Sequence, residues 1–132
     1  MLVLYTRKPR MILRQLKELI DNGDIRTWEH SQYNNNVTRF DWTGGDENWP
    51  NLDERVYFTM TTGYPSDPEA DTIMSFKLHT KSGHRLEASD YAKIHSELLY
   101  TLMAHVSENI TFIQLHNPSK AWHRADIIDR KI

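Results

Sequence analysis

The spacing of hydrophobic and polar residues changes along the chain and predicts an α+β fold. Residues 1–6 form a short apolar run that is typical of a buried strand. Between Ile12 and Ile20 the apolar residues recur at helical spacing, after Pro9, which suits a first helical turn, and before Gly23, which suits the position just past a helix end. We therefore predict a strand over 1–6 and a helix over 9–22.

The middle of the chain alternates with a period of two, as expected for strands that bury one face. We predict strands over 25–30, 37–42, 55–62 and 72–80. Clusters of turn-forming residues separate them, including Tyr33-Asn34-Asn35-Asn36. In the fourth of these strands, Met74, Phe76 and Leu78 face one way, and Lys77 and His79 face the other.

A second helix is predicted over 89–108, with Ser89 as its N-cap. Its apolar positions are Tyr91, Ile94, Leu98, Leu99, Leu102 and Val106. Residues 109–116 read as a last strand that Pro118 stops. After Ser119, the spacing of Trp122, Ala125, Ile128 and Ile132 allows either a short final helix or a tail.

This order of elements predicts an α+β fold, in which a mostly antiparallel sheet of about five or six strands carries two main helices on one face. We expect residues 1–118 to form one α+β domain and residues 119–132 a C-terminal helix or tail. An unpaired first or last strand would be a natural edge for a homodimer.

Composition narrows the functional classes without selecting one. The chain has 132 residues and no cysteine, which excludes disulfides, thiolate nucleophiles and cysteine metal sites. Its net charge of −2 does not by itself select a nucleic acid or an anionic membrane as partner. The first residues lack the features of a signal peptide, and no stretch is long and apolar enough to span a membrane, so we expect a cytoplasmic protein with no membrane partner.

Acidic residues are concentrated in the loops of the middle region, where aromatic residues accompany them. Residues 21–72 contain three cations and eleven anions. Aromatic anchors supply binding energy and the surrounding charge steers encounter, so such a surface is suited to a protein partner. Our leading hypothesis is a small protein-binding module of the inhibitor, immunity or accessory type. Its expected binding residues are Asp46, Glu47, Trp49, Asp53 and Tyr64.

The first twenty residues have the opposite charge, with five cations and one anion. Three of the cations share one side of the predicted helix, and the other two come just before it. A basic stripe of this kind can be an ordinary solvated helix face, or it can contact phosphates. The alternative hypothesis is therefore nucleic-acid binding through Arg7, Lys8, Arg10, Arg14 and Lys17.

Seven histidines keep a third hypothesis open, that of a small metal-dependent or acid/base enzyme. His79 and His84 flank a predicted turn, but two imidazoles do not complete a zinc site. His95 and His105 both fall on the apolar side of the second helix, about 15 Å apart, so they cannot share a metal.

His95 would become a poised acid or base only beside a carboxylate, such as Glu29 or Asp41. The chain has no phosphate-binding loop, nucleophile elbow or His-Glu-x-x-His motif. We therefore expect no cofactor, no metal and no catalytic residue, and a binding protein rather than an enzyme.

Overall fold

The computed structural model describes residues 1–44, 56–80 and 86–115, and confirms the α+β fold. The elements run in the following order along the chain: β1 (Leu2–Thr6), α1 (Pro9–Asp21), β2 (Trp28–Asn34), β3 (Val37–Trp42), β4 (Val56–Gly63), β5 (Thr72–Thr80), α2 (Ala88–His105), the short 3₁₀ helix η2 (Ser107–Asn109) and β6 (Phe112–Leu115). None of the described helices is long and apolar enough to cross a membrane.

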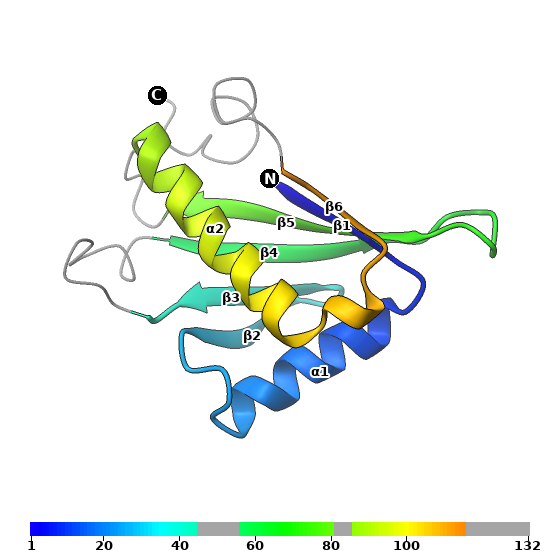
Figure 1. Cartoon of the computed structure of the whole chain (residues 1–132), viewed down its shortest axis with the longest axis horizontal. Coiled ribbons are helices and arrows are strands. Elements are labelled where there is room, and N and C mark those ends of the chain that lie inside the picture. The colour runs from blue at the N-terminus through cyan, green and yellow to red at the C-terminus, as the bar shows by residue number, and fades with distance from the viewer. Residues whose placement is uncertain (45–55, 81–85, 116–132) are drawn as a thin grey trace.

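The six described strands form one antiparallel sheet with the order β2-β3-β4-β5-β1-β6 (Figure 1). Strand β1 lies inside the sheet, where it pairs with β5 on one side and with β6 on the other. The two edges of the described sheet are therefore β2 and β6. Of the two strands that we expected as a dimerisation edge, the last one lies at an edge and the first does not.

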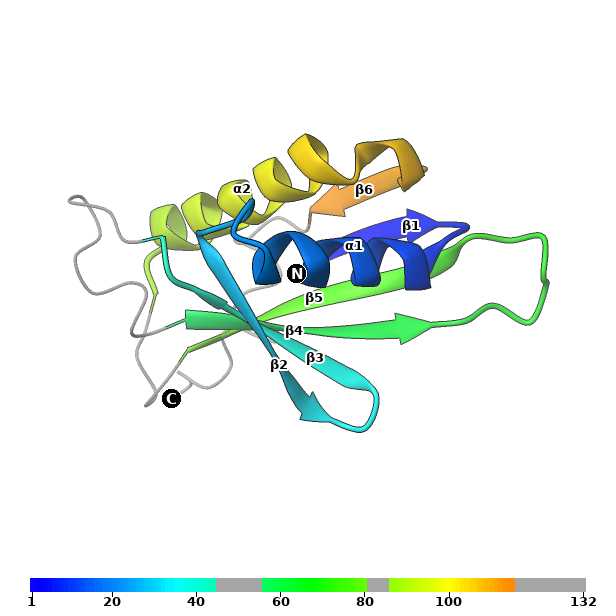
Figure 2. The same cartoon turned by 90° about the horizontal axis from the view of Figure 1, so that it is seen from below.

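The molecule has two layers, because α1 and α2 lie on the same face of the sheet (Figure 2). The core fills the space between the layers, and alternate residues of β3 and β5 enter it, as predicted for Met74, Phe76 and Leu78. The fully buried core side chains include Leu2, Leu4, Ile12, Phe58, Phe76, Ile94 and Leu102. The strands β2, β3, β4 and β5 thereby direct their other side chains to the opposite face, which we call the far face.

Helix α1 forms as its sequence predicts, with its apolar stripe against the sheet. Ile12 and Leu16 are buried, whereas Arg10 and Arg14 are exposed. At its end Gly23 has a φ of +87°, a conformation that glycine adopts without strain. The backbone N–H groups of Asp24 and Ile25 both donate to the carbonyl of Leu19 and turn the chain toward β2.

The hairpin of β2 and β3 is tighter than the sequence suggests. Strand β2 begins at Trp28 rather than at residue 25, and it continues to Asn34. Tyr33 and Asn34, which we assigned to a turn, belong to this strand because a register shift between Gln32 and Asn34 keeps them beside β3. The turn itself is only two residues long.

The second helix also has different ends from those predicted. It begins at Ala88 because the extended residue before it, Glu87, occupies the N-cap position, so Ser89 is not the cap. It ends at His105, and the chain passes through η2 before β6 begins at Phe112. The helix or tail predicted over 119–132, and the domain boundary before it, lie outside the described residues.

A buried hydrogen bond ties α2 to β2. The indole N–H of Trp28 donates to the hydroxyl of Thr101 at 3.0 Å, and that hydroxyl donates to the carbonyl of Glu97 at 3.0 Å. The Trp28 ring also packs edge-on against Trp42, with 5.0 Å between ring centroids. The hydroxyl thus satisfies a polar atom that the core would otherwise leave without an acceptor.

Replacement of Thr101 by valine tests this link. Thr101→Val keeps the shape but removes the acceptor, so it should lower the free energy of unfolding by about 1–3 kcal/mol. The control is Ser96→Ala, because Ser96 also donates to a carbonyl four residues earlier, at 2.8 Å, but is exposed. Urea denaturation should show a change within about 0.5 kcal/mol for the control. Equal effects of the two changes would contradict the role of the buried bond.

A second prediction concerns Tyr91, whose side chain is fully buried. Burial raises the pKa of Tyr91 to about 12, whereas an unfolded tyrosine titrates near 10. The unfolded state therefore loses this proton first, so the wild type should lose stability as the pH rises from about 10 to about 12. Burial lowers the pKa of the neighbouring Met1 amine to about 5, so the amine does not titrate in this range.

The Tyr91→Phe variant lacks the phenol, so its stability should fall less over the same interval. Urea denaturation followed by circular dichroism at several alkaline pH values compares the two proteins. The prediction is wrong if their free energies of unfolding decline in parallel.

Candidate functional site

The acidic surface that the sequence predicts for protein binding lies mostly outside the described residues. This applies to Asp46, Glu47, Trp49 and Asp53. The fifth residue, Tyr64, follows β4 in the connection to β5, and 62% of it is exposed. Protein binding through this set stays a prediction, and the surroundings of Tyr64 define a different site.

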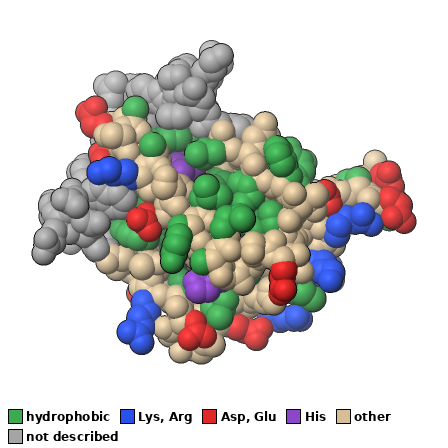
Figure 3. Space-filling view, viewed as in Figure 1, with side chains coloured by type: hydrophobic (Ala, Val, Ile, Leu, Met, Phe, Trp, Pro, Cys, Tyr) green, Lys and Arg blue, Asp and Glu red, His purple; other side chains and the backbone are tan. Residues whose placement is uncertain are grey.

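Tyr64 faces the beginning of α1 across a hollow lined by cations. The hollow has an empty volume of about 840 Å³, counting space open to solvent. Its lining residues are Arg7, Lys8, Pro9, Arg10, Met11, Arg14, Tyr64 and Thr72. In Figure 3, Lys and Arg side chains gather at the side of the molecule where α1 begins. The fold thus brings four of the five predicted basic residues to one cavity.

The fifth basic residue, Lys17, lines a second hollow farther along α1. This one has an empty volume of about 930 Å³ and again includes Tyr64 in its wall. The remaining lining residues are Leu13, Gln32, Asn35, Asn36, Thr38, Met60 and Thr62. We call the two hollows together the α1 groove, because α1 and Tyr64 border both.

Two of the groove cations have acidic neighbours. Arg7 pairs with Glu69 at 3.1 Å, and Arg14 with Glu18 at 3.6 Å. All four side chains are more than half exposed, and such ion pairs contribute little in water. A phosphate could replace either carboxylate at small cost. Within the described part of the chain, Lys8, Arg10 and Lys17 form no ion pair.

The end of α1 adds to the positive potential of the first hollow. The N-cap position is Lys8, no side chain caps the helix, and no acidic residue occupies its first turn. The positive end of the helix dipole therefore lies beside a hollow that already contains Arg7 and Arg10. This arrangement favours an anion.

Sequence analysis missed the amide side chains of the groove. Gln32, Asn35 and Asn36 come from the β2–β3 hairpin, where the run of asparagines indicated only a turn. Amides both donate and accept hydrogen bonds, so they can pair with a ligand group that has a donor beside an acceptor. Lysine and arginine only donate and cannot pair in this way. Their proximity to α1 depends on long-range packing, which leaves no local signal.

The histidines do not form a metal site in the described part of the chain, where no group of three potential ligands occurs. His95 is buried in the core, where its ring lies 4.1 Å from that of Tyr91 and 5.1 Å from that of Phe58. The suggested pairing of His95 with Glu29 or Asp41 is wrong, because those carboxylates belong to the far face, on the other side of the sheet.

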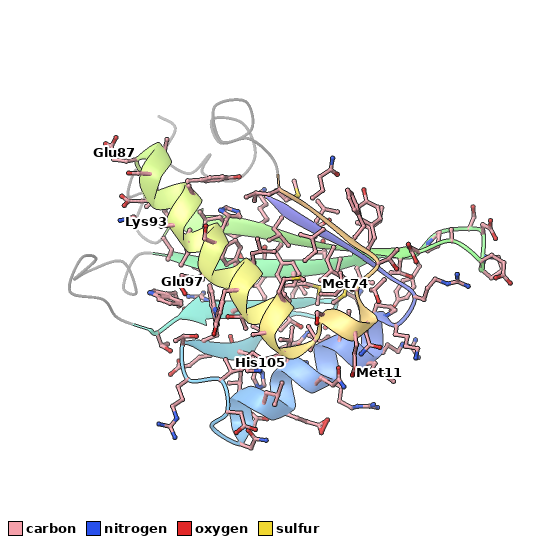
Figure 4. The ribbon with its side chains drawn as sticks, viewed as in Figure 1. Met11, Met74, Glu87, Lys93, Glu97 and His105 are labelled. Carbon is pink, nitrogen blue, oxygen red and sulfur yellow. The ribbon has the colours of Figure 1, made fainter. Side chains whose placement is uncertain are left out.

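His105 is exposed in the last turn of α2 (Figure 4), although the helical period places it on the apolar side of the helix. A helical wheel gives its direction correctly, but burial also requires a neighbouring element opposite that turn. His79 lies on the far face, as predicted, and His84 lies outside the described residues.

His79 belongs to a second feature that sequence analysis missed, a cluster of planar side chains on the far face. Its imidazole stacks on the ring of Tyr57, with 4.9 Å between centroids and 8° between planes. On Tyr57 also lies the guanidinium of Arg39, 3.7 Å from the ring centroid. Tyr33 completes this far-face cluster. Because the residues come from four strands, only the pairing order of the strands brings them together.

Comparison of the chain with models of protein families, with curated proteins and with solved structures gave no match. The two candidate sites are therefore interpreted from their own geometry and charge.

Proposed function

We propose that this protein binds nucleic acid through the α1 groove. The observation that carries the proposal is the convergence of Arg7, Lys8, Arg10 and Arg14 on one hollow at the beginning of a helix. Cations and a helix N-terminus both attract phosphate, and release of counterions from the phosphate chain supplies most of the affinity in such complexes.

The second hollow supports a nucleic acid over a simple anion or an acidic peptide. Lys17 continues the positive charge about 10 Å along the helix from Arg10, which suits a chain of phosphates rather than a single one. Gln32, Asn35 and Asn36 can donate to and accept from base edges. The exposed ring of Tyr64, placed between the two hollows, offers a surface on which a base can stack.

Removal of two groove cations tests the proposal. Arg10→Gln combined with Arg14→Gln should weaken binding of a labelled thymidine oligonucleotide of about 12 nucleotides, a length suited to small single-strand-binding folds. If each arginine neutralises one phosphate of the single strand, the slope of log affinity against log salt concentration should become shallower by about 1.4. Fluorescence anisotropy across a salt series from about 50 to about 200 mM measures both quantities.

The matched control is Lys93→Gln, which removes a cation from α2 (Figure 4). It should leave the affinity and the salt slope unchanged. Because Arg10 and Arg14 are exposed, the double variant should unfold within about 0.5 kcal/mol of the wild type for each change. Absence of oligonucleotide binding by the wild type at low salt would rule out the proposal, and so would an identical slope in the double variant.

A further inference from the structure

The far-face cluster combines flat surfaces with nearly balanced charge. The side chains of Arg39 and Asp41 form two hydrogen bonds, at 2.7 and 2.9 Å. The hydrogen bond to Asp41 raises the pKa of Arg39, so the guanidinium stays charged and keeps its carboxylate neighbour. The positive charge is thereby compensated locally. Unlike the α1 groove, this surface does not favour a phosphate.

The planar groups are held in place by the sheet. Tyr57 and His79 are directly opposite each other on β4 and β5, and the hydroxyl of Thr59 lies 2.8 Å from Nε2 of His79. Arg39, on β3, also lies over the ring of Tyr57. Such cross-strand contacts stabilise the sheet, and they also keep the rings in one orientation, which lowers the entropy lost when a planar ligand stacks on them.

Tyr33 is the exposed member of the cluster. Its ring centroid lies 6.3 Å from that of Tyr57 and 6.5 Å from that of His79, and 48% of the residue is exposed. Its ring is inclined to theirs by 33° and 26°. An exposed tyrosine beside a rigid ring stack is a surface on which the π-face of a nucleobase can pack.

The far-face cluster and the α1 groove meet at the edge of the sheet. Gln32 lines the groove, and Tyr33, the next residue, contacts the rings of the far face. Successive residues of a strand point to opposite faces, and β2 is an edge strand. A chain bound in the groove therefore reaches the cluster by passing around a single strand.

We infer that Tyr33, supported by Tyr57 and His79, stacks an unpaired base of the nucleic acid bound in the α1 groove, and that the ligand is single-stranded. This inference rests on the proposed function and specifies its ligand class. The groove contacts phosphates, and the far-face cluster contacts a base. A duplex cannot present a base in this way, because its bases are stacked on one another and paired.

The test compares two probes of equal length and charge: the thymidine oligonucleotide of about 12 nucleotides, and an abasic oligonucleotide with the same phosphates. The variant Tyr33→Ala should bind the thymidine probe about 5-fold to 100-fold more weakly than the wild type. It should bind the abasic probe as the wild type does. Tyr33→Phe keeps the ring and should stay within about 2-fold of the wild type on both probes.

The test includes a control variant and a substitute variant in case Tyr33→Ala is less stable than the wild type. Tyr100→Ala removes a tyrosine of α2 that is 70% exposed, and it should change neither affinity. Tyr33→Leu keeps an apolar side chain without a flat ring, so it replaces Tyr33→Ala if that protein has a lower urea midpoint. Tyr33→Leu should likewise bind the thymidine probe more weakly than the wild type and bind the abasic probe equally well.

Each outcome separates the inference from the proposed function. In one outcome, the wild type binds the abasic probe with a salt-dependent affinity, and replacement of Tyr33 does not weaken binding of the thymidine probe. The proposed binding in the α1 groove then stands, and base stacking on Tyr33 is wrong. An equal loss on both probes also overturns stacking, because it indicates an effect on phosphate binding. If the wild type binds neither probe, both the function and the inference fail. Tighter binding of a duplex than of the thymidine probe contradicts the single-stranded ligand.

Discussion

Burial of one face of the sheet beneath α1 and α2 determines where the polar side chains of the strands lie. Because side chains alternate along a strand, a residue that faces the helices is followed by one that faces away from them. Met74 and Phe76 enter the core in this way, whereas Lys77 and His79 do not. A shift of one residue in the register of a strand would move its apolar side chains to the far face and its polar side chains into the core. The apolar pattern therefore determines which residues lie on each face of the sheet.

The distribution of charge then favours different kinds of ligand at the α1 groove and at the far-face cluster. The chain as a whole has a net charge of −2, but interactions between exposed charges fade within about 10 Å at moderate ionic strength. Local groups therefore dominate. At the beginning of α1, exposed cations and the helix dipole act together, and their carboxylate neighbours are weakly held. On the far face, the charge of Arg39 is compensated by Asp41, and planar groups dominate.

Much of this architecture could be predicted from local patterns, and the parts that could not depend on contacts between distant residues. The stripe from Ile12 to Ile20 and the alternation around Phe76 predicted a helix and a strand that the structure confirms. The position of β1 between β5 and β6 has no local signal, because it depends on long-range pairing.

The candidate sites likewise combine features that local sequence patterns predict with features that depend on contacts between distant residues. The basic stripe on α1 was visible in the sequence, but its hollow forms only where Tyr64 approaches from the β4–β5 connection. Tyr33 was assigned to a turn, because its neighbours are asparagines and the register shift that keeps it beside β3 has no local signal. Burial of His95 followed from the helical period, whereas exposure of His105 depends on what lies opposite the end of α2.

The most direct test of the central claim is a map of amide chemical shifts while isotopically labelled protein is titrated with the thymidine oligonucleotide. Binding that passes from the α1 groove around β2 predicts the largest shifts at Arg10, Lys17, Asn36 and Tyr33, and none at the exposed residues Lys93 and Tyr100 of α2. Shifts centred on α2, or no shifts during the titration, would contradict the account.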